Sequence, residues 1–244
     1  MMGARSRPAR VVLVAGTLLA VAAGVTGACR QGWTERRERM VREQIEARGV
    51  RDPDVLAAMR AVPRHLFVDE GYRAEAYDDA PLPIGDGQST PQPYLAALMA
   101  ELLEVEAGDR VLEVGSGSGY QAAVLGEMGV EVFTIEIRPR LCQRAAQTLT
   151  ELGYPSVEVR CGDGYGGWPE EAPFDGIVVT AAPETIPGPL YEQLEEGGHM
   201  VIPVGQFYQD LKVVTRTAGG FEERSVIPVR IGGFDRERPA AGAD

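Results

Sequence analysis

Apolar and polar positions along the chain follow two different periods. From residue 110 to residue 205, short runs of β-branched and apolar residues predict strands, and the segments between them have the composition and spacing of helices. The predicted strands are "RVLEVG", "EVFTIEI", "SVEVRCG", "FDGIVVTAA" and "GHMVIPVG", and the predicted helices are "YQAAVLGEM", "PRLCQRAAQTLTELG" and "IPGPLYEQLEEGG". Strands joined by single helices require right-handed crossovers, so this part of the chain predicts a parallel sheet.

The last predicted element is a hairpin. Residues 210–231, "DLKVVTRTAGGFEERSVIPVRI", predict two strands that turn at Gly219 and Gly220. Together with the earlier strands, the hairpin completes the predicted fold class. We expect an α/β, doubly wound, mostly parallel seven-stranded sheet of Rossmann-like type, closed by a C-terminal antiparallel hairpin and preceded by helices.

The predicted N-terminal helices come before the sheet. Residues 35–48 combine helix-forming residues with a thin apolar stripe, and Gly49 ends the run. A second helix is predicted after Asp52, an N-cap residue type that precedes Pro53 at the first helical position. Residues 69–93 are rich in loop-forming residues, and a further helix is expected to about Val105.

The first 29 residues have the pattern of an export signal. Arginines precede an apolar run over residues 11–25, and small residues then lead to Cys29. The run is shorter than the ~20 apolar residues of a membrane-spanning helix, and Cys29 after Gly27 and Ala28 resembles the end of a bacterial lipoprotein signal. An uncleaved anchor is the alternative, because the arginines that follow residue 29 would hold the next domain in the cytoplasm.

These patterns divide the chain into three parts. We expect a signal or membrane-anchor segment at 1–29, one domain at 33–234 and a disordered tail at 235–244. The sequence favours an exported or membrane-attached protein that meets the membrane only through its first segment. A cytoplasmic protein is the alternative.

Composition and charge exclude several classes of partner. Of the 244 residues, 44% are hydrophobic and 25% are charged, which is typical of a globular domain with a full core. The net charge of -12 opposes binding to the phosphate backbone, so no nucleic acid partner is expected. The cysteines and histidines lack metal-site spacing, and no metal is expected. Cys142 and Cys161 are expected as buried thiols, or as a pair if the protein is exported.

The most specific motif is "VLEVGSGSGYQAAVL", residues 111–125. Gly115, Gly117 and Gly119 follow the first predicted strand and open a helix, so that a cofactor can approach the backbone, with Ser116 inside the same turn. Tyr120 stands where a dinucleotide-binding turn requires glycine or alanine, which argues against a nicotinamide cofactor. Glu113, inside the strand, suits a ligand that carries an ammonium and a sulfonium.

Two further carboxylates follow the next strands. Glu136 ends the second strand, where it can accept hydrogen bonds from ribose hydroxyls, and Asp163 with Gly164 follows the third, where a carboxylate can bind the amine of adenine. The alternatives are a solvated strand end for Glu136 and a turn for Asp163 and Gly164. Because the strand ends of a doubly wound sheet share one crevice, these groups together predict S-adenosylmethionine as cofactor.

From about Val55 to Arg230, the chain resembles the protein-L-isoaspartate (D-aspartate) O-methyltransferase family of class I methyltransferases. The matching pieces are "VPRHLFV", "YDDAPLPIGDGQ", "QPY", "VLEVGSGSGYQAAVL", "GDGYGGWPEEAPFDGIVVTAAPETIP" and "QLEEGGHMVIPVG". The resemblance implies that S-adenosylmethionine methylates the free carboxylate of L-isoaspartyl and D-aspartyl residues in damaged proteins or peptides, giving an ester that collapses to a succinimide. It also implies a cytoplasmic location, and we expect a monomer.

The stretch "GDGQSTPQPY" departs from that family. Members typically have G-Q-T-I-S-Q-P-Y, and their serine is assigned to catalysis; in register, Pro91 takes that position here. Ser89 and Thr90 are therefore the candidate catalytic hydroxyls. For Thr90 the alternative is an N-cap with Pro91 at the first helical position and the hydroxyl bonded to the Gln92 N–H. The alternative for the whole chain is a cofactor-binding protein that has weak or lost activity.

A second departure lies at the C-terminal end. The family usually closes with V-R-F-V-P-L, whereas this chain has "VRIGGFDRERPAAGAD". The final strand therefore lacks an aromatic residue and a proline that would form part of a wall.

Overall fold

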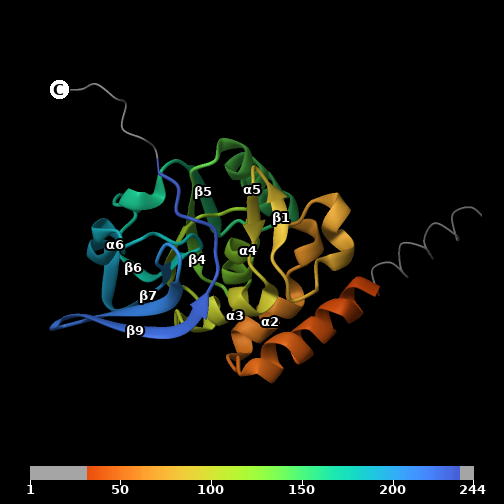
Figure 1. The fold of residues 1–244 in the computed structure, drawn as a ribbon, viewed down its shortest axis with the longest axis horizontal. Coiled ribbons are helices and arrows are strands. Elements are labelled where there is room, and N and C mark those ends of the chain that lie inside the picture. The colour runs from red at the N-terminus through yellow and green to blue at the C-terminus, as the bar shows by residue number, and fades with distance from the viewer. Residues whose placement is uncertain (1–31, 237–244) are drawn as a thin grey trace, which may run out of the picture.

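The computed structural model describes residues 32–236, which form a seven-stranded sheet with helices on both faces (Figure 1). The order of the strands is β5-β4-β3-β6-β7-β8-β9. The first five along the chain pair in parallel, and the last two pair antiparallel. Their bounds are β3 Arg110–Val114, β4 Glu131–Glu136, β5 Val157–Cys161, β6 Phe174–Val179, β7 Leu194–Val204, β8 Gln209–Thr217 and β9 Gly220–Val229. The predicted sheet and its C-terminal hairpin are confirmed.

Successive residues of the central strands face opposite layers of the core. On β3, Val111 packs in the layer that contains α4 (Tyr120–Glu127) and α5 (Pro139–Leu152), whereas Leu112 packs in the layer of α6 (Gly188–Gln193). Because both residues are fully buried, each face of the sheet is covered. This explains why the central strands are almost continuously apolar in sequence.

The N-terminal helices pack beside α2 (Pro53–Ala61) and α3 (Pro93–Glu101), as Figure 1 shows in red and orange. The predicted helix at 35–48 is α-helical from residue 32, the first described residue, only to residue 40. It continues as a π-turn at Val41–Ile45 and a 3₁₀ turn at Glu46–Arg48, before Gly49 with φ 107°. The predicted cap of α2 is confirmed, since Asp52 Oδ1 accepts from the Asp54 and Val55 amides at 2.9 Å.

Two predictions of local structure are wrong. Residues 194–198 belong to β7 rather than to a helix, because Leu194 pairs with Phe174 of β6 and pairing overrides the local preference. Within the predicted loop 69–93, Leu82–Gly85 (β1) and Gln88–Thr90 (β2) form a small antiparallel sheet. The strands are too short for an alternating pattern to reveal them.

Thr90 does not cap α3. The helix begins at Pro93 with Gln92 as N-cap, while Thr90 pairs with Leu82 at the end of β2. The helix cannot begin at Pro91, because the backbone of Gln92 is extended, with ψ 151°. Pro93 suits the first helical position, where its missing N–H removes no helical hydrogen bond. The capping hypothesis for Thr90 is therefore wrong, and its hydroxyl has another partner.

Cys142 and Cys161 form a disulfide between the first turn of α5 and the last residue of β5. The hypothesis of two buried thiols is wrong, since Cys142 is buried but Cys161 is exposed. The predicted segment 1–29 lies outside the described residues. Within 32–236, no helix is long and apolar enough to cross a membrane.

Candidate functional site

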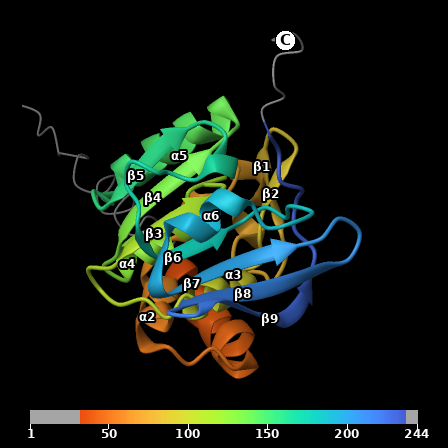
Figure 2. The ribbon, with the colours of Figure 1, turned by 90° about the vertical axis from the view of Figure 1, so that its left-hand side faces the viewer.

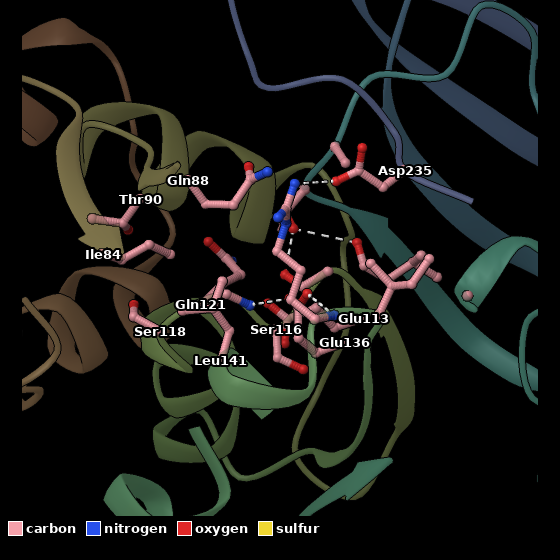
Figure 3. Close-up of a pocket in the computed structure, with 18 of the residues that line it drawn as sticks. Ile84, Gln88, Thr90, Glu113, Ser116, Ser118, Gln121, Glu136, Leu141 and Asp235 are labelled. Atoms are coloured by element: carbon pink, nitrogen blue, oxygen red, sulfur yellow. Dashed lines mark hydrogen bonds and ion pairs between the residues drawn. The ribbon is translucent and has the colours of Figure 1, made fainter. Parts of the chain in front are cut away.

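A pocket opens at the carboxyl ends of β3, β4 and β6, where the strand order changes direction. Its walls come from the turns after these strands, from the β1–β2 hairpin and from residues 233–235. Figure 3 shows Glu113, Ser116 and Glu136 on one wall and Gln88 and Thr90 across from them. The pocket lies where the sequence predicted a ligand crevice.

The turn after β3 allows the backbone to approach a ligand closely. Gly115, Gly117 and Gly119 have φ values of 103°, 54° and 85°, a region that favours glycine. A Cβ on Gly115 would lie 2.4 Å from Thr180 Oγ1, so no side chain fits there without displacing Thr180. Gly115 and Gly117 line the pocket, whereas Gly119 caps α4 and packs against Leu149.

Glu113 lines the pocket with a carboxyl group of which only one oxygen is hydrogen-bonded. The residue is fully buried, and its Oε2 accepts from the Thr134 hydroxyl, which also bonds to Ser116 Oγ at 2.6 Å. Its other oxygen, Oε1, has no partner among the described residues. Burial, with a smaller contribution from the neighbouring Glu136, raises the pKa of Glu113 to about 8, although the Thr134 hydrogen bond lowers it. A cationic group in the pocket would relieve both effects.

Gln121, in α4, provides a second buried group without a partner. Its Nε2 has no hydrogen-bond acceptor among residues 32–236, although the residue lines the pocket and is only 7% exposed. An unbonded acceptor at Glu113 and an unbonded donor at Gln121 match the ammonium and the carboxylate of an amino acid. No sequence pattern indicated Gln121, because glutamine in a helix is ordinarily a solvated residue.

Glu136 is buried, at 5% exposure, so the hypothesis of a solvated strand end is wrong. Its two oxygens accept from the Gly117 amide at 2.8 Å and from the Arg138 amide at 2.9 Å. These bonds orient the carboxylate at the pocket wall. Each oxygen has a second lone pair, so hydroxyl donors such as those of ribose can still bind.

Asp163 forms a turn with Gly164, which was the alternative to a role in binding adenine. Its Oδ1 accepts from the Tyr165 amide at 2.9 Å, and its Oδ2 lies 3.8 Å from Arg236 Nε. Gly164 lines the pocket, and a Cβ there would lie 2.5 Å from Val114 Cγ1. Gly164 thus keeps this corner open, while contact of Asp163 with adenine stays a prediction.

The pocket is also lined by the three residues at which the stretch "GDGQSTPQPY" departs from the family, Ser89, Thr90 and Pro91. Ser89 is exposed, whereas Thr90 is buried and its hydroxyl oxygen accepts a hydrogen bond from Arg64 Nη1 at 3.4 Å. Ser89 is therefore the hydroxyl that remains accessible to a substrate.

Arg64 is a residue that the sequence did not identify. It is fully buried, donates to the carbonyls of Ala76 and Pro91 at 2.8 and 2.9 Å, and lies over the Tyr120 ring. The guanidinium therefore contacts Pro91 through its main-chain carbonyl and not through its side chain. Its distance of 27 positions from Pro91 explains why no local pattern indicated the contact.

The C-terminal segment 231–236 forms the wall that the sequence left uncertain. The Ala182 amide donates to the Gly232 carbonyl at 2.9 Å, and the Phe234 amide donates to the Ala182 carbonyl at 3.1 Å. Asp235 pairs with Arg138 at 2.6 Å, and a rotated Gln88 amide accepts from Arg138 at 2.8 Å. Asp235 and Arg236 are thus held against the site, and only residues 237–244 of the predicted tail lie outside the described residues.

No group of three or more acidic, histidine or cysteine side chains in residues 32–236 is arranged to hold a metal ion. The pocket instead offers a glycine turn and two unpartnered buried groups that fit an amino-acid moiety. These groups also fit S-adenosylmethionine, whose methionine part carries an ammonium and a carboxylate.

The fold and this pocket define a class I methyltransferase. The family model described as protein-L-isoaspartate(D-aspartate) O-methyltransferase matches residues 35–231. The chain belongs to this family.

Curated relatives agree over most of their length. The protein-L-isoaspartate O-methyltransferase of Gloeobacter violaceus is 55% identical over 202 residues, which cover 82% of this chain and 98% of the relative. The protein of the same name from Opitutus terrae is 51% identical, with 95% of this chain and 99% of the relative covered.

Solved structures show the same fold. A protein-L-isoaspartate O-methyltransferase superposes with a TM-score of 0.75 at 29% identity, covering 81% of this chain; the match spans 65% of that longer chain. A putative protein-L-isoaspartate O-methyltransferase from Plasmodium falciparum, solved with S-adenosyl-L-homocysteine, gives a TM-score of 0.71 at 24% identity. The match covers 82% of this chain and 99% of that one.

Proposed function

We propose that this chain transfers a methyl group from S-adenosylmethionine to the free carboxylate of L-isoaspartyl and D-aspartyl residues in damaged proteins. The observation that carries the proposal is the pair of unpartnered buried groups, Glu113 Oε1 and Gln121 Nε2, beside the glycine turn of a family member. Their chemistry complements the amino-acid part of the cofactor.

We assign the cofactor to the wall made by β3, β4 and β6. Glu113 and Gln121 would hold the methionine part, with the Gly115–Gly117 backbone alongside it. Glu136 would bind the ribose hydroxyls, and Gly164 would leave room for adenine beside Asp163. When bound, the cofactor supplies a methyl group made electrophilic by a positively charged sulfur.

The acceptor needs positioning rather than activation. A carboxylate with a pKa near 4 is already ionised at pH 7, so no general base has to remove a proton. The carboxylate oxygen forms a bond to the methyl carbon as the carbon–sulfur bond breaks, and the protein must hold these atoms in line. Ser89, exposed at the pocket, can donate a hydrogen bond to the acceptor, whereas Thr90 is buried and its hydroxyl oxygen accepts from Arg64.

Labelled methyl transfer tests the proposal. We expect transfer to a peptide that contains L-isoaspartate and none to the matching aspartyl peptide. Equal transfer to both, or transfer to neither, would contradict it. If calorimetry shows that S-adenosylmethionine binds without turnover and Pro91→Ser restores transfer, the chain is the cofactor-binding protein that the sequence left as the alternative.

We also propose that the protein is exported and attached to a membrane through Cys29. The disulfide between Cys142 and Cys161 supports this, because disulfides persist mainly in oxidising compartments. Export would separate the enzyme from the cytoplasm, where its cofactor is made, so a cytoplasmic location remains the alternative outcome. Cell fractionation and mass spectrometry for lipid on Cys29 decide between them, and light scattering tests the proposed monomer.

A further inference from the structure

A groove lies next to the pocket, on the far side of the C-terminal segment. Gly233 and Phe234 line both depressions, so the two adjoin, one on each side of this segment. The opposite side of the groove is formed by residues 205–208, the loop between β7 and β8. We call this depression the flanking groove.

Two aromatic side chains at the tip of this loop are almost completely exposed. Phe207 is 88% and Tyr208 is 95% exposed, compared with 44% for Phe221, the next most exposed large hydrophobic residue described. Leaving adjacent aromatic rings in water forgoes the free energy of burying them, so such a pair indicates a contact surface.

The loop is anchored at its base. Gly205 has φ 125°, its amide donates to the Pro183 carbonyl at 2.9 Å, and a Cβ there would lie 2.0 Å from the Tyr208 carbonyl oxygen. The turn therefore depends on glycine and presents the two rings from a fixed base. The loop follows the carboxyl end of β7, and Figure 2 shows it projecting beyond the sheet.

The methyl acceptor of the proposed reaction is a residue within a polypeptide. When its carboxylate enters the pocket, the residues before and after it must leave across the adjoining surface. The flanking groove adjoins the pocket at Phe234, so a polypeptide that crosses this segment reaches the groove. Its aromatic side suits apolar side chains of the departing segment.

We propose that Phe207 and Tyr208 bind apolar or aromatic side chains that flank the isoaspartyl residue of the substrate polypeptide. This inference rests on the proposed function and adds a substrate preference to it. The enzyme then favours damaged sites in apolar sequence, which become accessible when a protein unfolds locally.

The test compares two isoaspartyl peptides that differ only in flanking residues, leucine and phenylalanine in one and glycine in the other. For the wild-type protein, we expect KM for the apolar peptide to be about tenfold lower, the effect of about 1.4 kcal/mol of binding. Phe207→Ser/Tyr208→Ser should remove this difference by raising KM for the apolar peptide, with kcat within about twofold. Tyr72→Ser is the matched control, because Tyr72 is exposed but lines neither depression.

Three results would overturn this inference and leave the proposed function standing. The first is equal KM values for the two peptides with the wild-type protein. The others are an equal rise in KM for both peptides in the double variant, and a rise in KM of the same size in Tyr72→Ser. A dimer that the double variant dissociates, with KM unchanged, would also overturn it and assign the rings to a second copy of the chain. Failure of the wild-type protein to methylate either peptide would overturn the proposed function as well.

Discussion

Glu113, which lines the pocket, is fully buried, with one carboxyl oxygen bonded to Thr134 and the other without a partner among the described residues. The arrangement costs free energy in the empty protein, because the charged form is poorly solvated. A positively charged ligand recovers that cost when it binds. At the scale of single residues, Glu113 thus lowers the stability of the empty protein and raises its affinity for a positively charged ligand.

We predict that Glu113→Gln stabilises the empty protein at high pH. Burial raises the pKa of Glu113 from 4.5 to about 8, so between these values the unfolded chain has lost a proton that the folded chain keeps. The free energy of unfolding therefore falls as pH rises through this window and levels off above it. Urea denaturation at pH 8.5 should show the variant to be more stable by about 2–4 kcal/mol. The gain is limited because the amide of glutamine is also buried without a partner.

At pH 4 the two proteins should differ least, since Glu113 is protonated in both the folded and the unfolded state. The same variant should bind S-adenosylmethionine at least about tenfold more weakly by calorimetry, because the carboxylate that faces the cation is gone. A parallel pH dependence in both proteins would contradict the assignment of the shift to Glu113.

We predict that Ser89 and Thr90 separate function from stability. Ser89→Ala should lower kcat/KM for an isoaspartyl peptide by about 10-fold to 1,000-fold, the usual effect of losing a positioned donor, and leave the melting temperature unchanged. Thr90→Val should destabilise the protein by about 1–2 kcal/mol, because it removes an oxygen that faces the buried Arg64 cation. Thermal denaturation and steady-state kinetics measure both, and a catalytic loss confined to Thr90→Val would reverse the assignment.

At the scale of elements, the pocket is closed by segments that are distant in sequence. Arg138 follows β4 and pairs with Asp235 of the C-terminal segment, 97 positions away, while Arg64 contacts the loop after β2. The β1–β2 hairpin, the β4–α5 turn and residues 231–236 meet at Gln88, Arg138 and Asp235. The wall on this side therefore depends on contacts between elements.

We predict that Asp235→Asn weakens product binding without unfolding the protein. The Arg138–Asp235 pair is a third to half exposed, so its loss should change stability by less than about 1 kcal/mol. The dissociation constant for S-adenosylhomocysteine should rise about threefold to tenfold, mainly through faster release of the ligand. Glu170→Gln, which breaks the exposed pair with Arg160, is the control. Equal release rates in all three proteins would show that residues 231–236 do not retain the ligand.

At the scale of the whole molecule, the disulfide ties α5 to β5 at the edge of the sheet. Both cysteines lie close to the pocket in sequence, Cys142 next to the pocket residue Leu141 and Cys161 before the Asp163–Gly164 turn. The covalent link stabilises the fold chiefly by restricting the unfolded chain.

We predict that reduction of the disulfide lowers the free energy of unfolding by about 3 kcal/mol, the value expected for closing a loop of this size; the two cysteines are 19 positions apart. Urea denaturation with and without reductant measures it, and Cys142→Ser/Cys161→Ser should be insensitive to reductant. A wild-type protein unaffected by reductant would indicate that the cysteines are not paired in solution.

The sequence alone determined the strands and helices of the α/β sheet, the glycine turn and the two carboxylates at the strand ends. These features depend on residues close together in the chain, such as Gly115 and Glu113, and on periodicities that burial imposes. The fold class and the family followed from them.

Only the tertiary structure decided which groups share the pocket and how each is bonded. Glu113 Oε1 and Gln121 Nε2 are buried without a partner among the described residues, and the Thr90 oxygen accepts from Arg64, which reaches it from another element. Phe234 and Asp235 close the wall through contacts across the fold, and strand pairing drew residues 194–198 into β7. Such contacts join residues far apart in the chain, and no local pattern of hydrophobicity or propensity encodes them.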